Sequence, residues 1–202
     1  MAFHSTCVRR VPATTAVVVL AIASAAALSA ATGTDTVQGR ARAADGVEIA
    51  YTVRGTGTVA LVFIHGGLAD RTFWKGQLDA LSSRFRVVAL DLAGHGESGR
   101  RAAYTMSAWA DDVRAVVDTL HLERVVLVGN SLGGPVALEA AHLLPGRVLG
   151  VIGIDTLHDL TQKMDEAASR SRAEAIRSDF AGTCRSMVNE LFHPVERKRI
   201  PA

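Results

Sequence analysis

The sequence predicts an α/β fold in which a mostly parallel, doubly wound sheet carries an antiparallel N-terminal hairpin and helices on both faces. Three observations predict it. Apolar runs recur at residues 59–64, 86–90, 125–128 and 148–154, as expected for strands that are covered on both faces. Stretches with apolar residues at helical spacing separate these runs, and such alternation is typical of parallel strands joined by right-handed crossovers. Two shorter stretches of alternating polarity precede the first run and predict the hairpin.

The chain begins with a segment typical of an export signal. Arg9 and Arg10 stand near the start without an acid, and residues 11–28 are uncharged. Small residues follow, which suits cleavage near Ala30 or Ala31. The alternative is an uncleaved membrane anchor over residues 11–31, but the many Ala and Thr residues make this stretch only mildly apolar. We therefore predict a signal peptide over residues 1–31, no stable membrane span after cleavage, and a periplasmic or secreted protein.

The remaining elements follow in order along the chain. Residues 37–43 and 47–53 are the hairpin strands, with Asp45-Gly46 as the turn between them. Helices are predicted between the apolar runs and after the last one, at residues 72–83, 106–120, 134–144, 160–177 and 179–192. Beyond residue 154, no apolar run remains that could form a central strand. The predicted organisation is a core over residues 32–159 and a helical segment over residues 160–202.

Length and composition favour one globular domain without a nucleic-acid partner. The chain has 202 residues, of which 49% are hydrophobic, enough for a single substantial core. Its 22 Lys and Arg residues against 20 Asp and Glu residues give a net charge of +2 with no polybasic stripe. Cys7 lies in the leader and Cys184 stands alone, which excludes an internal disulfide or a cysteine metal site in the mature chain. We expect no metal and no cofactor.

The strongest chemical signal is the segment Gly129-Asn130-Ser131-Leu132-Gly133. A G-x-S-x-G match alone is weak evidence, but this one lies between the strand at 125–128 and a predicted helix. A turn of this tightness requires small neighbours two residues either side of the serine. It lifts the Ser131 hydroxyl above the sheet and leaves the next N–H at a helix N-terminus. Ser131 is therefore the predicted nucleophile, and the alternative is an ordinary glycine-rich turn with a capping serine.

A second segment, His65-Gly66-Gly67, follows the apolar strand at 59–64. Acyl transfer generates an oxyanion that requires two preorganised donors. The N–H of Leu132 is one candidate donor, and the backbone at Gly67 is the other, because a residue without a side chain allows close approach. We expect His65 to hold this loop by hydrogen bonding rather than to act as a base.

A third segment, Asp91-Leu92-Ala93-Gly94-His95-Gly96-Glu97-Ser98, follows the strand at 86–90. The three segments in this order, within residues 47–155, resemble the α/β-hydrolase superfamily of the serine-nucleophile type. The resemblance implies a hydrolase that acts on ester, thioester or amide bonds of a small-molecule substrate without a metal. It also implies that Asp91 and His95 support the architecture, so His95 is not the expected base. A serine at this turn argues against the dehalogenase and epoxide-hydrolase branches, which use Asp there.

The resemblance further implies a triad in the chain order Ser, acid, His. Asp155, directly after the last apolar run, is the candidate acid, with a helix-capping or loop role as the alternative. In the family the catalytic His follows one or two further strands, and His142, His158 and His193 do not stand at such a position. We therefore expect a chain truncated inside the helical cap, without the last sheet strands or the base, and a strongly reduced activity.

Two other functional classes are compatible with a doubly wound α/β fold. If no base activates Ser131, the chain is a catalytically dead fragment or a pseudoenzyme with a binding role. A nucleotide-binding doubly wound domain is excluded, because no G-x-G-x-x-G follows the first parallel strand and no Walker lysine is present. The lack of further strands also predicts an exposed apolar sheet edge and self-association through it.

Overall fold

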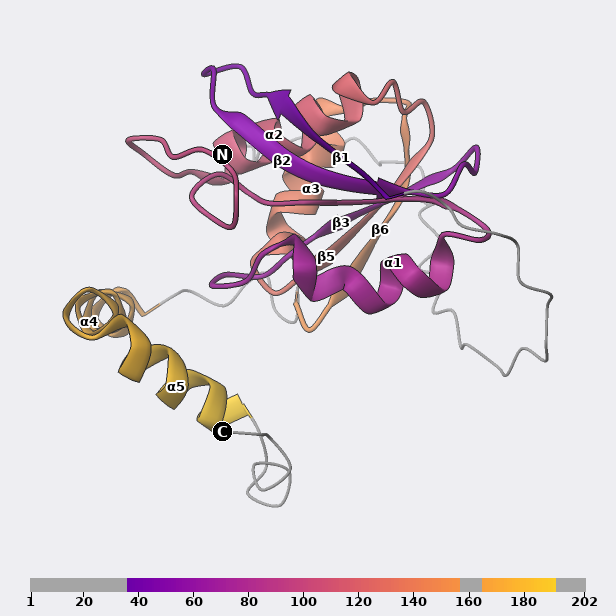
Figure 1. The fold of residues 1–202 in the computed structure, drawn as a ribbon. Helices are drawn as coiled ribbons and strands as arrows, with labels where there is room; N and C mark the ends of the chain where they lie inside the picture. Colours follow the sequence, from indigo (N-terminus) through magenta and orange to yellow (C-terminus); the bar gives the residue numbers. More distant parts are fainter. Residues whose placement is uncertain (1–35, 157–164, 192–202) are drawn as a thin grey trace, which may run out of the picture.

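The structure is a computed structural model that describes residues 36–156 and 165–191. Six strands in this part of the chain form one mixed sheet (Figure 1). Their order across the sheet is β1-β2-β4-β3-β5-β6. The pairs β1–β2 and β2–β4 are antiparallel, and the pairs β3–β4, β3–β5 and β5–β6 are parallel. The predicted fold class is therefore confirmed. The strands span Val37–Arg42 (β1), Glu48–Arg54 (β2), Ala60–Ile64 (β3), Arg86–Leu90 (β4), Val125–Asn130 (β5) and Val148–Ile154 (β6).

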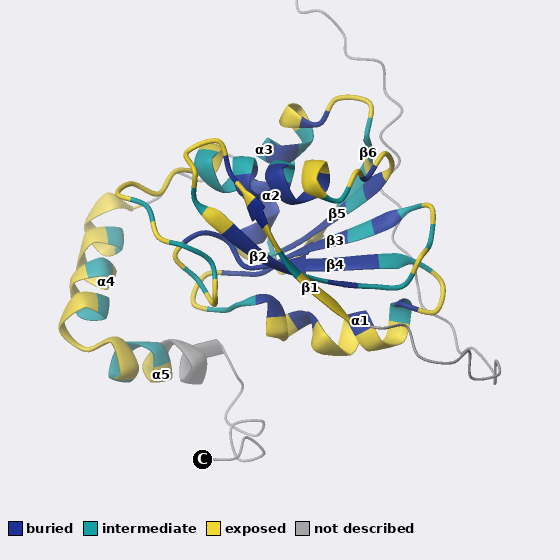
Figure 2. Ribbon diagram, turned by 45° about the horizontal axis from the view of Figure 1, so that its top comes forward, coloured by how far each residue is buried: buried dark blue, intermediate teal, exposed yellow. Residues whose placement is uncertain are grey.

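Helices cover both faces of the sheet. α1 (Lys75–Leu81) lies on one face, and α2 (Met106–Thr119) and α3 (Gly133–Leu143) lie on the other (Figure 2). The larger apolar core lies between the sheet and the α2–α3 pair, where Val113 and Val116 of α2 are fully buried. A smaller core on the α1 face is centred on Trp74. Helices thus pack on both faces of the sheet, as the alternation of strands and helices in the sequence predicts.

The helix predicted at residues 72–83 is two elements in the structure. It begins with a 3₁₀ turn, η1 (Arg71–Trp74), and continues as α1. Asp70 produces this tight start, because its carboxylate accepts hydrogen bonds from the Thr72 N–H at 2.8 Å and from the Thr72 hydroxyl. Trp74 then lies at the junction with 1% of its surface exposed, so the core fixes the point at which the two elements meet.

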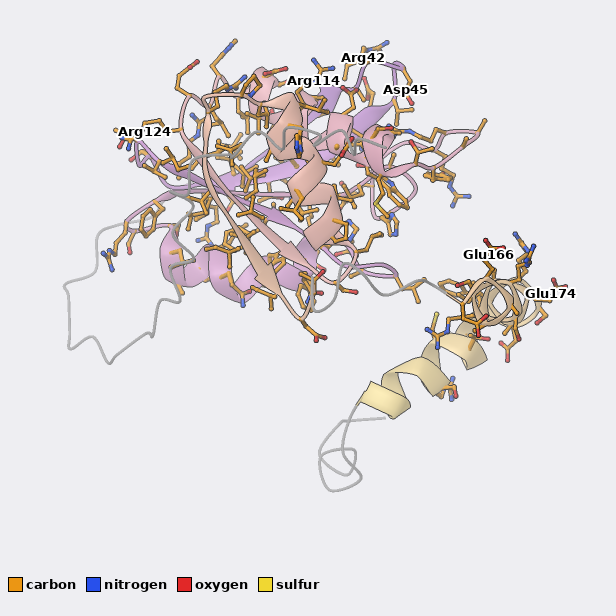
Figure 3. All side chains as sticks on the ribbon, turned by 180° about the vertical axis from the view of Figure 1, so that it is seen from behind. Arg42, Asp45, Arg114, Arg124, Glu166 and Glu174 are labelled. Atoms are coloured by element: carbon orange, nitrogen blue, oxygen red, sulfur yellow. The ribbon has the colours of Figure 1, made fainter. Side chains whose placement is uncertain are left out.

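The segment after the sheet contains α4 (Glu166–Ser178) and α5 (Phe180–Leu191), close to the two helices predicted there. Asp165 caps α4 by accepting the N–H groups of Ala167 and Ala168 at 2.9 and 3.1 Å. α4 has no buried residue, and Figure 3 shows its Glu166 and Glu174 apart from the sheet. Its expected role as the start of a cap stays a prediction.

Several predictions concern residues outside the described ranges. The signal peptide at residues 1–31 lies there, as do His158 and His193. Periplasmic or secreted localisation therefore stays a prediction. In the ranges 36–156 and 165–191, no helix is both long enough and apolar enough to cross a bilayer.

Candidate active site

Ser131 stands at the turn between β5 and α3, with an exposed side chain. Its φ of +48° lies in the left-handed region, which is unusual for a residue other than glycine. The two glycines of the motif make this turn sterically possible. A Cβ at Gly129 would overlap the carbonyl oxygen of Gly133, and a Cβ at Gly133 would overlap the carbonyl oxygen of Ile64. The motif therefore forms the strained, tightly packed turn that its spacing predicts.

The His65-Gly66-Gly67 segment lies next to this turn. β3 and β5 are parallel neighbours, with Ile64 paired to Gly129, so the loops that follow the two strands emerge side by side. A Cβ at Gly66 would lie 3.2 Å from the Ser131 Cβ, and a Cβ at Gly67 would lie 4.0 Å from the Leu132 Cδ2. Among the described residues, no acceptor bonds the main-chain N–H of Gly67 or Leu132. The loop that carries Gly67 therefore packs next to the turn that carries Ser131 and Leu132, and the role of the two N–H groups as oxyanion donors stays a prediction.

His65 is fully buried beneath this loop. Its Nε2 accepts the Leu92 N–H at 3.1 Å, and its Nδ1 lies 2.7 Å from the Gly66 carbonyl oxygen. These contacts place the single imidazole proton on Nδ1. Burial lowers the pKa of His65, which keeps the ring neutral. Since both ring nitrogens are engaged away from Ser131, His65 holds the loop and does not serve as a base.

Asp91 supports the same region from the end of β4. Its buried carboxylate accepts the Arg71 N–H at 2.6 Å and the Glu97 N–H at 2.8 Å, and it pairs with the Arg71 guanidinium. Gly96 has a φ of +47°, and a Cβ there would overlap this carboxylate. His95 Nδ1 lies 3.3 Å from the Ala93 carbonyl oxygen. The segment from residue 91 to residue 98 therefore braces the loop that follows β3.

Asp155, the candidate acid, lies directly after β6 with its side chain exposed. The structure places its backbone beside the turn that carries Ser131, because the Ile154 carbonyl oxygen accepts the Ser131 N–H at 3.1 Å. Asp155 also has a positive φ, +48°. The backbone of Ser131, Leu132 and Gly67 thus lies together, and Asp155 follows β6, the strand that pairs with β5.

A base for Ser131 is not identified in the described part of the chain. None of its four histidines, at positions 65, 95, 121 and 142, bonds the Ser131 hydroxyl. His142 instead points back along its helix, with Nδ1 3.0 Å from the Leu138 carbonyl oxygen. In residues 36–156 and 165–191, no group of three or more His, Cys, Asp or Glu side chains is arranged to hold a metal.

Sequence reasoning missed two supporting residues, Arg71 and Thr156. Arg71 joins the end of the loop after β3 to Asp91 and Glu97. Thr156 donates its hydroxyl proton to the Ser131 carbonyl oxygen at 2.6 Å. Neither residue stands in a recognisable motif, and each acts across more than 19 residues of sequence. Only the position of Thr156, just after the strand that pairs with β5, was a usable signal.

Comparison with known proteins agrees with this geometry. Residues 59–196 match a family model described as the alpha/beta hydrolase fold. An uncharacterized protein of Mycobacterium tuberculosis is 41% identical over 105 residues, which cover 52% of this chain and 30% of that protein. A thermophilic esterase from Thermogutta terrifontis shares 35% identity at a TM-score of 0.62, covering 69% of this chain and 53% of the esterase. The bottromycin epimerase BotH shares 34% identity at a TM-score of 0.62, covering 70% and 56%. The chain thus spans less than a third of the curated relative and about half of each solved structure.

Proposed function

Because this chain belongs to the α/β-hydrolase fold family, we propose that it is a serine hydrolase acting on ester, thioester or amide bonds of small molecules. One observation carries the proposal. Ser131 stands in a left-handed turn, the loop of Gly66 and Gly67 packs next to it, and no described group accepts a hydrogen bond from the main-chain N–H of Leu132 or Gly67. A hydroxyl beside two preorganised donors is the arrangement that acyl transfer requires. The similar esterase favours an ester as the bond that is cleaved.

In the proposed reaction, the Ser131 hydroxyl oxygen attacks the substrate carbonyl carbon while its proton passes to a base. The carbonyl oxygen becomes an oxyanion and is bound by the N–H groups of Leu132 and Gly67. Collapse of this intermediate breaks the bond to the alcohol, thiol or amine, which takes up the proton and leaves. Water then attacks the acyl group on Ser131 and releases the acid. Asp155 is the proposed acid that would orient the base.

The structure identifies no such base among the residues that it describes. His65, His95 and His142 each contact a backbone group elsewhere, and none of the described histidines bonds the Ser131 hydroxyl. A serine hydroxyl without a base keeps a very high pKa, and the oxyanion donors alone leave a residual acceleration of about 10³–10⁴ over water. We therefore expect slow turnover of an activated ester such as p-nitrophenyl acetate by this chain.

Covalent labelling tests the proposal directly. A fluorophosphonate probe reacts with serines whose hydroxyl is nucleophilic, and mass spectrometry of the digested protein identifies the labelled peptide. We expect label on Ser131, none in Ser131→Ala, and unchanged labelling in Ser107→Ala, which removes an exposed serine on α2. Equal labelling of wild type and Ser131→Ala, or no label on wild type at long incubation, would refute the assigned nucleophile.

A binding role is the second candidate, and one observation favours it. No histidine bonds the Ser131 hydroxyl within the described residues. In that case a substrate-sized ester would bind the chain without turnover. Calorimetric titration with a non-hydrolysable phosphonate, compared between wild type and Ser131→Ala, separates the two: binding without labelling supports the binding role.

A further inference from the structure

The end of β6 holds the turn that carries Ser131, between β5 and α3. The Ile154 carbonyl oxygen accepts both the Ser131 N–H at 3.1 Å and the Asn130 Nδ2 at 3.0 Å. Two residues further on, the Thr156 hydroxyl donates to the Ser131 carbonyl oxygen at 2.6 Å. The main-chain N–H and C=O of Ser131 are therefore both bonded to one short segment of chain, residues 154–156.

The packing around Thr156 matches this hydrogen bond. A Cβ at Gly134, in the first turn of α3, would overlap the Thr156 hydroxyl and methyl groups. Gly134 therefore leaves a space that the Thr156 side chain fills. The Gly134 N–H also donates to the Ser131 carbonyl oxygen, at 3.0 Å. That oxygen thus accepts one bond from the helix and one from Thr156.

A serine with a φ of +48° keeps this conformation only where its surroundings over-determine it. We propose that Thr156 is a positioning residue for Ser131. Its hydroxyl fixes the peptide plane that follows the Ser131 Cα, and that plane carries the Leu132 N–H. Thr156 thereby sets both the direction of the nucleophilic oxygen and the position of one oxyanion donor. This inference rests on the proposed role of Ser131 as nucleophile.

Two substitutions separate the hydroxyl from the shape of the side chain. Thr156→Val keeps the volume that packs against Gly134 and removes the donor. Thr156→Ser keeps the donor and removes the methyl group. If Thr156 only fills space, Val is the milder change; if its hydroxyl positions Ser131, Ser is the milder change.

The experiment measures the second-order rate of fluorophosphonate labelling at Ser131 in the full chain. We expect Thr156→Val to react about fivefold more slowly, the factor that corresponds to loss of one typical hydrogen bond. We expect Thr156→Ser to react within about twofold of wild type, because its donor is retained. Melting temperatures identify any variant that fails to fold. The proposal is overturned if Thr156→Val is labelled at the wild-type rate. It is also overturned if the labelling rate falls by the same factor in both variants.

If the probe does not label the wild type, the proposed role of Ser131 as nucleophile is refuted. A second measurement then still tests whether Thr156 positions the backbone of Ser131. Hydrogen exchange of the Ser131 amide, followed by NMR, reports on the bond to Ile154 without any reaction. Thr156→Val should accelerate this exchange about fivefold, and Thr156→Ser should leave it near the wild-type rate. Unchanged exchange in Thr156→Val shows that the hydroxyl does not hold the turn.

Discussion

Single side chains connect the loops that frame Ser131, and Asp112 on α2 is one of them. It is fully buried, accepts the Ala93 N–H at 2.9 Å, and pairs with Arg101. Burial raises the pKa of Asp112 from 3.8 to about 6, although the Ala93 N–H and Arg101 favour the charged form. Asp112 therefore ties the segment after β4 to α2 while it carries a poorly solvated charge.

Replacing Asp112 by Asn should remove a pH dependence of stability. The pKa in the folded protein lies above the unfolded value of 3.8, so the folded state holds the extra proton more tightly. Tighter proton binding by Asp112 in the folded state therefore stabilises the fold, fully below about pH 4, and this stabilisation is lost as the pH rises through about 6. Relative to Asp112→Asn, the wild-type free energy of unfolding should fall by roughly 3 kcal/mol across this window. Urea unfolding of both proteins at several pH values measures the difference, and a difference that stays constant contradicts the prediction.

Gly133 is the second residue whose substitution has a defined outcome. A Cβ there would overlap the carbonyl oxygen of Ile64, and backbone atoms of β3 cannot move without disturbing the sheet. Gly133→Ala should therefore lower the free energy of unfolding by about 3 kcal/mol. Gly76→Ala is the matched control, because nothing lies within 4 Å of a Cβ at that exposed position in α1. We expect it to raise stability by about 1 kcal/mol. Equal effects of the two changes in thermal unfolding would show that the space around Gly133 is not restricted.

Among the elements, the loop between β3 and η1 determines how Gly66 and Gly67 approach Ser131. It is fixed at both ends. At its start, His65 bonds the Leu92 N–H, and at its end Arg71 pairs with Asp91 and bonds the Thr52 hydroxyl at 3.1 Å. Arg71 and Asp91 are 8% and 0% exposed, so the loop depends on a buried ion pair.

Removal of the Arg71 cation should destabilise the fold strongly. Arg71→Met keeps most of the apolar stem and leaves the Asp91 carboxylate buried with only N–H partners. The expected loss is about 3 kcal/mol of unfolding free energy, measured by urea unfolding. Lys75→Met breaks the exposed pair with Asp79, and there the loss should stay below about 0.5 kcal/mol. If the free energy of unfolding falls equally little in both variants, the Arg71–Asp91 pair does not hold the loop.

The elements themselves were largely predictable, because each depends on local pattern. The buried strands are continuous apolar runs, and their predicted bounds agree with β3 to β6 to within two residues. The division of the helix at residues 72–83 was not predictable, since it depends on the Asp70 carboxylate and on burial of Trp74. Helical spacing alone does not distinguish a 3₁₀ turn from the first turn of an α-helix.

The candidate site was predictable only where its residues are close in sequence. The Ser131 turn and the Gly66-Gly67 loop carry motifs because their backbone geometry demands glycines. Arg71 and Thr156 contribute single hydrogen-bonding groups to distant partners, and many residue types at those positions would look equally ordinary in the sequence. The role of Arg71 appears only when the sheet order places β4 beside β3, and for Thr156 the sequence offers no more than its position just after β6, which pairs with β5.

Across the whole described sheet, the two edges differ in charge. β1, at one edge, carries Arg40 and Arg42, and such charges hinder pairing with another strand. β6, at the other edge, has the sequence Val-Leu-Gly-Val-Ile-Gly-Ile, without charge or proline. Its Leu149, Ile152 and Ile154 are 51%, 45% and 42% exposed. β6 is therefore the edge through which the sheet can extend.

The predicted partner of β6 in this chain is the β6 of a second copy. Two uncharged strands related by a two-fold axis can pair antiparallel without placing like charges opposite one another. The pairing would satisfy the outer N–H and C=O groups of both strands and cover Ile152. Sedimentation velocity over a range of concentrations should show a monomer–dimer equilibrium. Ile152→Lys should weaken the dimer by at least about tenfold, since the charge must be desolvated at the interface.

Val37→Lys is the matched control for this change, because Val37 is also an exposed apolar residue, 57% exposed, but lies on β1 at the opposite edge. The control should dimerise as wild type does, since β1 takes no part in the predicted pairing. A wild-type chain that sediments as a monomer at every concentration contradicts self-association. If Ile152→Lys still dimerises as wild type does, the interface lies elsewhere than β6. If only Val37→Lys weakens the dimer, the interface is at β1, where it would have to accommodate the Arg side chains.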